Sequence, residues 1–246
     1  MPTLPPWFSR HRNKLIAAVV AVLLVTVVGP FVYINVIKED APDKPSVDDI
    51  SVSADSSTST STAAGAPAVD DGTIDGTWTV QQGDEVFAGY RAKEVLFGQD
   101  AEAVGRTGDV TGTLTASGTT VTAVDVTVDM TTVESDESRR DGQFQGRIMS
   151  TSEFPTAEFH LTEPIELGSL PAEGEKITLE AIGELTLRGV SQPVTVELEA
   201  KRQAGTLVVS GSAELDFDDF EIPDASGGPA TVGRTGSFEL LLVFAR

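Results

Sequence analysis

The chain has 246 residues, a formal net charge of −21 and no cysteine. The lack of cysteine excludes disulfides, thiolate metal sites and anchors made by lipidated cysteine. The strong negative charge argues against nucleic acid as a partner, because binding the phosphate backbone needs clustered Lys and Arg.

The first recognisable element is an uncharged, mostly apolar run over residues 15–37, which follows a short tail at 1–14. As a helix this run would be about 34 Å long, enough to cross a hydrocarbon core of about 30 Å. Arg10, Arg12 and Lys14 precede it, and acidic residues follow it. Positive charge favours the cytoplasmic side. We therefore expect a single-pass cell-membrane protein with a cytoplasmic N-terminus and an extracytoplasmic C-terminal domain.

A cleaved signal peptide is the alternative interpretation of this run. The apolar core of a signal peptide is shorter, and a small-x-small cleavage site follows it. Residues 29–37 read GPFVYINVI and contain no such site. An uncleaved anchor is therefore favoured, and cleavage stays open.

Pro, Ser, Thr, Ala and Asp dominate residues 38–76, with SSTSTST at 56–62. Such a composition cannot bury enough apolar surface to offset the entropy lost on ordering. We predict a disordered acidic linker with a reach of about 30–35 Å.

Residues 77–246 have the length of one domain and alternate between apolar and polar side chains along several stretches. Val124, Val126 and Val128 share one face of the stretch 120–129. The same period of two recurs over 177–187, 194–201, 207–215 and 238–244. This period, with glycine-containing turns between the stretches, predicts antiparallel strands that form a sandwich or a closed barrel.

Residues 136–149 lack this alternation and predict a short helix. The sequence SRRD at 138–141 could form a capping box. Phe144 and Ile148 are then i,i+4 neighbours, and Arg140 and Arg147 fall on one side of the helix. Guanidinium groups bind anionic groups well, although ion pairs with nearby carboxylates are the simpler interpretation.

Few residues suggest catalysis or a metal. The two histidines are His11, in the N-terminal tail, and His160, in a strand-like segment. The acidic run 216–221 is interpreted as a solvated strand face with Phe217 turned inward, and 226–229 as a turn. We expect no enzyme activity, no catalytic residues, no metal and no cofactor.

Four stretches together are similar to a known family: SRRDGQFQGRIM at 138–149, EFPTAEF at 153–159, GELTLRGVSQPV at 183–194 and DFEI at 219–222. The chain resembles the YceI-like family over residues 77–246, although Glu221 stands where that family commonly has glycine. The resemblance implies an all-β, lipocalin-like antiparallel barrel of about eight strands with one short helix. It also implies an isoprenoid or other amphiphilic lipid bound in an apolar lumen without catalysis.

The full expectation is a cytoplasmic tail (1–14), a transmembrane helix (15–37), a disordered linker (38–76) and a lipid-binding barrel (77–246). The partners are a lipid and, through residues 15–37, the cytoplasmic membrane; a homodimer stays open. The alternative is a structural or sensory ectodomain whose filled barrel binds a protein. The candidate head-group residues are Arg140 and Arg147. The candidate lumen residues are Val124, Val126, Val128, Phe144, Ile148, Leu179, Val196, Leu198, Val209 and Leu240.

Overall fold

The computed structural model describes residues 14, 16–19, 21–22, 41–50 and 73–246, which fall into two compact units, Met1–Ala41 and Pro42–Arg246. In the first unit, the described residues between 14 and 22 are helical. No helix among the described residues is both long enough and apolar enough to span a bilayer. Most of the predicted tail (1–14) and of the predicted span (15–37) lies outside the described residues.

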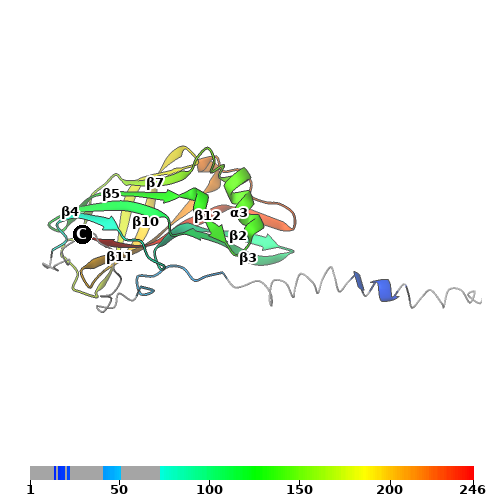
Figure 1. The fold of residues 1–246 in the computed structure, drawn as a ribbon, viewed down its shortest axis with the longest axis horizontal. Helices are drawn as coiled ribbons and strands as arrows, with labels where there is room; N and C mark the ends of the chain where they lie inside the picture. The colour runs from blue at the N-terminus through cyan, green and yellow to red at the C-terminus, as the bar shows by residue number, and fades with distance from the viewer. Residues whose placement is uncertain (1–13, 15, 20, 23–40, 51–72) are drawn as a thin grey trace, which may run out of the picture. The chain divides into compact units, whose positions relative to one another are not determined.

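The second unit is built almost entirely from strands, as Figure 1 shows. The strands are β1 (Gly76–Val80), β2 (Phe87–Leu96), β3 (Gln99–Thr107), β4 (Val110–Ser117), β5 (Thr120–Asp129), β6 (Glu134–Ser135), β7 (Thr156–Leu161), β8 (Ile165–Glu166), β9 (Lys176–Leu187), β10 (Val190–Gln203), β11 (Thr206–Asp216) and β12 (Ala230–Ala245). The helical turns are η3 (Met130–Thr132), α3 (Ser138–Gln143), η4 (Phe144–Ile148) and η5 (Phe217–Phe220).

Eight antiparallel strands close into a barrel in the order β1-β4-β5-β7-β9-β10-β11-β12. The ring closes because β1 also pairs with β12, where Thr79 lies opposite Ala245 and Val80 opposite Phe244. The earlier part of β12 pairs with β2, and β3 and β6 extend the sheet from there. In Figure 1, α3 lies at one end of the barrel and the C-terminus at the other. The predicted all-β barrel is confirmed.

The stretch LTLRGV at 185–190 forms a hairpin whose turn joins β9 to β10. Arg188 and Gly189 both have positive φ, 51° and 76°, as a two-residue type I′ turn requires. Arg188 Nη1 donates a hydrogen bond to the carbonyl oxygen of Glu221 at 2.9 Å. Glu221, at the position where the family commonly has glycine, itself has φ 53° and ends η5. The contact therefore ties together two residues in left-handed conformation.

Two expectations about local structure are wrong. The acidic run 216–221 is not a strand face, because β11 ends at Asp216 and η5 follows, with Phe220 buried. Ser138 does not cap α3: the N-cap is Glu137, without a side-chain cap. Instead Asp141 accepts hydrogen bonds from the backbone N–H and the hydroxyl of Ser135.

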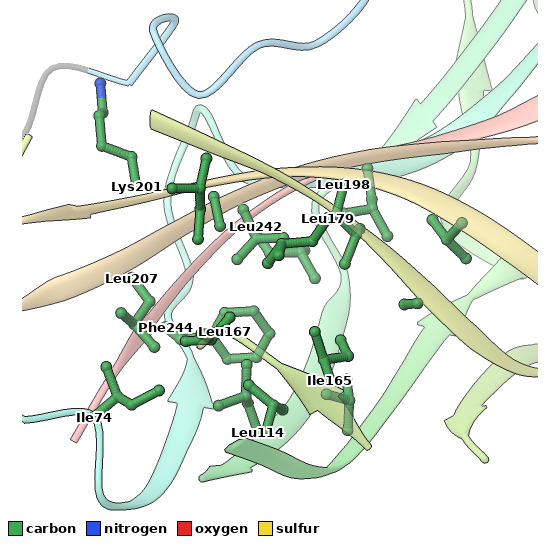
Figure 2. A pocket seen from close by; sticks show the side chains of 18 of the residues that line it. Ile74, Leu114, Ile165, Leu167, Leu179, Leu198, Lys201, Leu207, Leu242 and Phe244 are labelled. Atoms are coloured by element: carbon green, nitrogen blue, oxygen red, sulfur yellow. The ribbon is translucent and has the colours of Figure 1, made fainter. Parts of the chain in front are cut away.

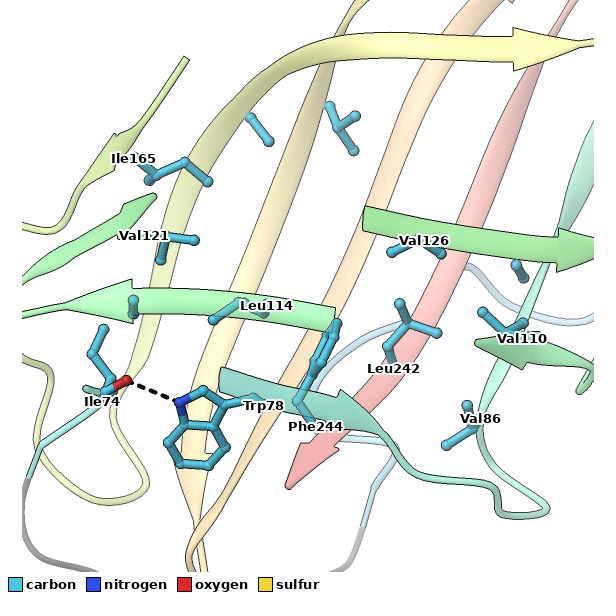
Figure 3. Packing of buried hydrophobic residues seen from close by; sticks show 14 of the residues in the cluster. Ile74, Trp78, Val86, Val110, Leu114, Val121, Val126, Ile165, Leu242 and Phe244 are labelled. Atoms are coloured by element: carbon cyan, nitrogen blue, oxygen red, sulfur yellow. Dashed lines mark hydrogen bonds between the residues drawn. The ribbon is translucent and has the colours of Figure 1, made fainter. Parts of the chain in front are cut away.

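The barrel interior contains two hydrophobic clusters. The first, shown in Figure 3, surrounds Trp78, Leu114, Leu242 and Phe244, and the Trp78 indole N–H donates to the carbonyl oxygen of Ile74 at 2.9 Å. The second lies towards α3 and is built around Phe144, Met149, Val133, Ala157, Leu185, Leu187, Leu215, Phe220 and Ile222.

A third cluster lies outside the ring, beneath residues 42–50, here called the docked segment. Val47 is 0% exposed and Ile50 is also buried, and both pack on Val208 and Leu241. The prediction of a disordered linker over 38–76 therefore does not hold for 42–50, nor for Ile74, which is buried before β1 begins. Residues 51–72 lie outside the described part of the chain.

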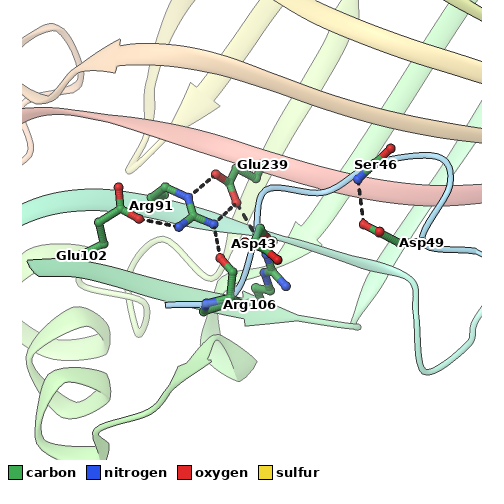
Figure 4. A network of polar contacts seen from close by, with 8 residues as sticks. Asp43, Ser46, Asp49, Arg91, Glu102, Arg106 and Glu239 are labelled. Atoms are coloured by element: carbon green, nitrogen blue, oxygen red, sulfur yellow. Dashed lines mark hydrogen bonds and ion pairs between the residues drawn. The ribbon is translucent and has the colours of Figure 1, made fainter. Parts of the chain in front are cut away.

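A buried charge network holds the start of the docked segment (Figure 4). Glu239, only 1% exposed, accepts two hydrogen bonds from Arg91, at 2.5 and 3.2 Å. Arg91 also donates to the carbonyl oxygen of Pro42 at 2.6 Å, and Arg106 donates to that of Asp43 at 2.8 Å. The hydrogen bond with Glu239 raises the pKa of Arg91, so the guanidinium stays charged under the segment.

We predict that Val47→Asp lowers the free energy of unfolding by about 2–3 kcal/mol, because a charge would replace a fully buried side chain. Urea unfolding measures the change, and limited proteolysis reports whether residues 42–50 become accessible. Lys44→Ala, an exposed position in the same segment, is the matched control and should behave as the wild type. Equal stability and equal protease resistance in Val47→Asp would contradict the docking.

We also predict a weak pH dependence from His160 on the outer face of β7. A hydrogen bond with Asp125 at 2.7 Å raises the pKa of His160 above 6.5. A raised folded-state pKa adds stability that is complete below about 6.5 and is lost as the pH rises through the folded value. Both side chains are about half exposed (49% and 58%), so the gain is a few tenths of a kcal/mol. Titration by NMR should show that Asp125→Asn lowers the pKa of His160. An unchanged pKa would mean that Glu158, rather than Asp125, raises it.

Candidate functional site

The half of the barrel opposite α3 is hollow, and Figure 2 shows the side chains around this cavity, here called the lumen. The space open to the centre of a water molecule is about 110 Å³, within about 940 Å³ of empty volume that includes the open mouth. Among the described residues, Lys201 and Arg202 are the only charged ones that line it. The others are Ile74, Leu114, Val121, Val124, Val126, Phe159, Ile165, Leu167, Pro171, Ile177, Leu179, Ala181, Val196, Leu198, Ala200, Leu207, Val209, Phe238, Leu240, Leu242 and Phe244.

The lumen is apolar because alternate residues of each strand point into the ring. Val121 and Val124 both line it although they differ in parity, because a bulge in the pairing of β4 with β5 shifts the register between them. Gly211 of β11 allows neighbouring lumen side chains to approach the strand closely. A Cβ on Gly211 would lie 2.6 Å from Leu198 Cδ2 and 3.4 Å from Leu240 Cδ1, so these two side chains occupy the space that a side chain at 211 would take.

The lumen is blind towards α3, because the second cluster fills that end. The rings of Tyr90 and Phe144 stack there with centroids 5.0 Å apart and an interplanar angle of 11°. Burial raises the pKa of Tyr90, which therefore stays neutral. The mouth lies at the other end, near Leu207, Phe244 and the loop 167–171 between β8 and β9.

Seven of the ten predicted lumen residues line this cavity: Val124, Val126, Leu179, Val196, Leu198, Val209 and Leu240. Val128, Phe144 and Ile148 do not, because they pack in or against the second cluster. Phe144, the first residue of η4, is buried in the second cluster at the end of the barrel. These three side chains plug the barrel rather than line the lumen.

The two predicted head-group arginines are both engaged away from the mouth. Arg140 forms ion pairs with Asp136 and, at 3.2 Å, with Glu94. Arg147 donates to the carbonyl oxygens of Asp224, Ala225 and Ser226, and so holds the loop before β12. Neither arginine is among the residues that line the lumen.

Sequence reasoning missed part of the lumen. Ile177, Phe238, Leu242 and Phe244 belong to stretches whose alternation was visible, but that pattern cannot separate lumen from packed core. Lys201 ends the alternating stretch 194–201 and Arg202 follows it, and these two adjacent basic residues were an available signal. Ile165 and Leu167 lie in and beside the short β8, which carries no periodic pattern.

No arrangement for metal binding is present among the described residues, since no three His, Cys, Asp or Glu side chains gather there. In the acidic run, Asp218 is paired with Arg234, and Asp216 accepts from the Asp218 backbone N–H at 3.0 Å. Residues 226–229 form the predicted turn, with Gly227 bonded to Ala230. The geometry therefore offers one distinctive site, an apolar lumen with a cationic mouth.

Comparison with known proteins places this site in context. A curated relative from Vibrio campbellii, named "UPF0312 protein", is 31% identical over 110 residues, which are 41% of this chain and 53% of the relative. A UPF0312 protein from Vibrio parahaemolyticus is 30% identical over the same shares. The chain thus spans about half the length of the curated relatives it matches.

A solved structure described as a polyisoprenoid binding domain from Saccharophagus degradans has a TM-score of 0.55 to this chain, with 14% sequence identity. The match covers 68% of this chain and 97% of that one, and it shows a shared fold. The family model described as "YceI-like domain" matches residues 78–244, from Trp78 in β1 to Phe244 in β12. The chain belongs to the YceI-like family.

Proposed function

We propose that this protein binds an isoprenoid or other amphiphilic lipid in its lumen, without catalysis, while tethered outside the cytoplasmic membrane. The observation that carries the proposal is the hollow, apolar half of the barrel. A chain of hydrocarbon fits such a space better than a polar ligand, because the inner wall offers it no hydrogen-bonding side chain. The lumen is enclosed by one chain, so binding needs no second copy.

The energetics favour a lipid. Each methylene moved from water into the lumen contributes about 0.8 kcal/mol, so a long chain gains affinity without specific polar contacts. The space open to the centre of a water molecule, about 110 Å³, is smaller than the roughly 300–1,000 Å³ of typical small-molecule sites, so a single slender tail fits it better than a bulky ligand. The blind end sets a limit to how far a tail can extend towards α3.

The relative from Saccharophagus degradans, described as a polyisoprenoid binding domain, supports the same class of ligand. The alternative, an ectodomain with a filled barrel that binds a protein, is disfavoured by the open lumen. A filled barrel would leave no such space between its inner side chains.

The membrane tether rests on residues 15–37 of the sequence. An anchored barrel would remain close to the membrane that supplies its ligand. The positive residues before the run favour an inside N-terminus and an extracytoplasmic barrel.

We predict that Ala200→Trp, which places a large side chain in the open lumen from β10, lowers lipid affinity at least about tenfold, or about 1.4 kcal/mol. Lipid that co-purifies with the full chain is identified by native mass spectrometry and by organic extraction. Thr195→Trp, exposed on the other face of the same strand, is the matched control and should keep its lipid. A wild-type barrel that carries no lipid and takes up no prenyl or acyl chain would contradict the proposal.

The topology can be tested directly because the chain has no cysteine. We predict that Lys93→Cys, exposed on β2, reacts with a membrane-impermeant maleimide in cells with an intact cytoplasmic membrane, whereas Thr3→Cys reacts only after that membrane is opened. The reverse pattern, or release of the chain by alkaline carbonate, would contradict the anchored orientation.

A further inference from the structure

The charges at the lumen mouth are unusual for so acidic a chain. Lys201 and Arg202, adjacent at the end of β10, are the charged residues of the lining, and both are cations. The net charge of the chain is −21, so a random choice of charged residues would favour carboxylates. An apolar cavity whose charged lining residues are both cations is suited to a ligand with an apolar chain and a negative head group.

The ammonium group of Lys201 already binds a carboxylate. It lies 3.2 Å from Asp48 Oδ1, and the Lys201 side chain is only 11% exposed. Lys176 reaches the other oxygen of Asp48 at 3.5 Å, so two lysines converge on one carboxylate. The bond with Lys201 lowers the pKa of Asp48, which is therefore ionised.

Asp48 belongs to the docked segment rather than to the barrel wall. Figure 2 shows Lys201 at the edge of the lumen with its nitrogen directed towards that segment, while its aliphatic stem lies beside the cavity. The Asp48 side chain is 64% exposed, and an ion pair with so exposed a carboxylate is weak. The four-carbon stem of Lys201 is flexible, so its ammonium group can exchange Asp48 for another anion at the mouth.

Arg202 adds a second cation beside the first. Its Nη1 donates to the carbonyl oxygen of Pro171 at 3.3 Å, which holds the guanidinium next to the loop 167–171. A guanidinium binds phosphate or carboxylate through two parallel hydrogen bonds. An anionic head group would exchange for some of the present partners of Arg202.

We propose that the ligand is an anionic single-chain amphiphile whose tail fills the lumen and whose phosphate or carboxylate head group binds Lys201 and Arg202, with Asp48 occupying Lys201 until the ligand arrives. This inference rests on the proposed lipid-binding function and adds the class of head group. The apolar wall supplies affinity for any chain, whereas the two cations distinguish charged from neutral heads.

The test uses the full chain in lipid nanodiscs and three photoreactive probes of equal chain length: an alkyl phosphate, a carboxylic acid and an alcohol. Crosslinked peptides are mapped by mass spectrometry, which counts only labels on lumen residues. We expect one or both anions to label the lumen about tenfold more than the alcohol, the size expected for charge-assisted hydrogen bonds. The ratio of phosphate to carboxylate labelling identifies which head group is preferred.

The double variant Lys201→Met with Arg202→Met should lose this preference and still be labelled by the alcohol, which shows that the lumen is folded. Asp48→Asn should increase labelling by the anions, because it removes the competing carboxylate. Lys93→Met, an exposed cation on β2, is the matched control and should retain the full preference.

Equal labelling by all three probes overturns this inference and leaves the proposed lipid binding intact. A preference that survives in the double variant, or no gain in Asp48→Asn, overturns the assignment to these residues. If no probe labels the lumen, the proposed function fails and this inference fails with it.

Discussion

The whole structure depends on closure of the sheet, which is made by a short contact between its first and last strands. Only the pairs Thr79–Ala245 and Val80–Phe244 join β1 to β12. Once the ring is closed, one face of each strand is shielded from water, and the alternating apolar residues have an interior to occupy. Phe244 takes part in the closure and also lines the lumen, so the same residue serves the fold and the site.

A barrel of this size can be solid or hollow, and this one is both. The helical segment α3–η4 supplies Phe144, which stacks on Tyr90, and η5 supplies Phe220; together they fill one end. Among the described residues no comparable helical segment fills the other end, where the lining includes the small residues Ala181 and Ala200. The contrast between the two ends explains why residues that look alike in a strand pattern have different roles: Val126 lines a cavity, whereas Val128, two positions later, packs on the plug.

The docked segment completes a buried charge network on the outer wall of the barrel. Burying the carboxylate of Glu239 costs free energy, and Arg91 offsets this cost because the hydrogen bonds between them are well formed. The docked segment adds a further acceptor for Arg91, the backbone carbonyl oxygen of Pro42. Asp48 of the same segment pairs with Lys201 beside the lumen mouth. A stretch whose composition resembles a linker thus becomes part of the domain, since the buried side chains of Val47 and Ile50 and the hydrogen bonds from Arg91 and Arg106 hold it.

The sequence by itself indicated the strands β5, β9, β10, β11 and β12 and their faces, because period two is a local property. The stretch 120–129 coincides with β5, and the turn at Arg188–Gly189 follows from its residues. The sequence could not show which inward side chains contact one another and which leave a cavity, because that depends on residues of different strands, such as Leu198 and Gly211. The positions of Phe144, the docked segment and the Asp48–Lys201 pair were decided by tertiary structure alone, since each joins residues far apart in the chain through contacts that no local pattern records.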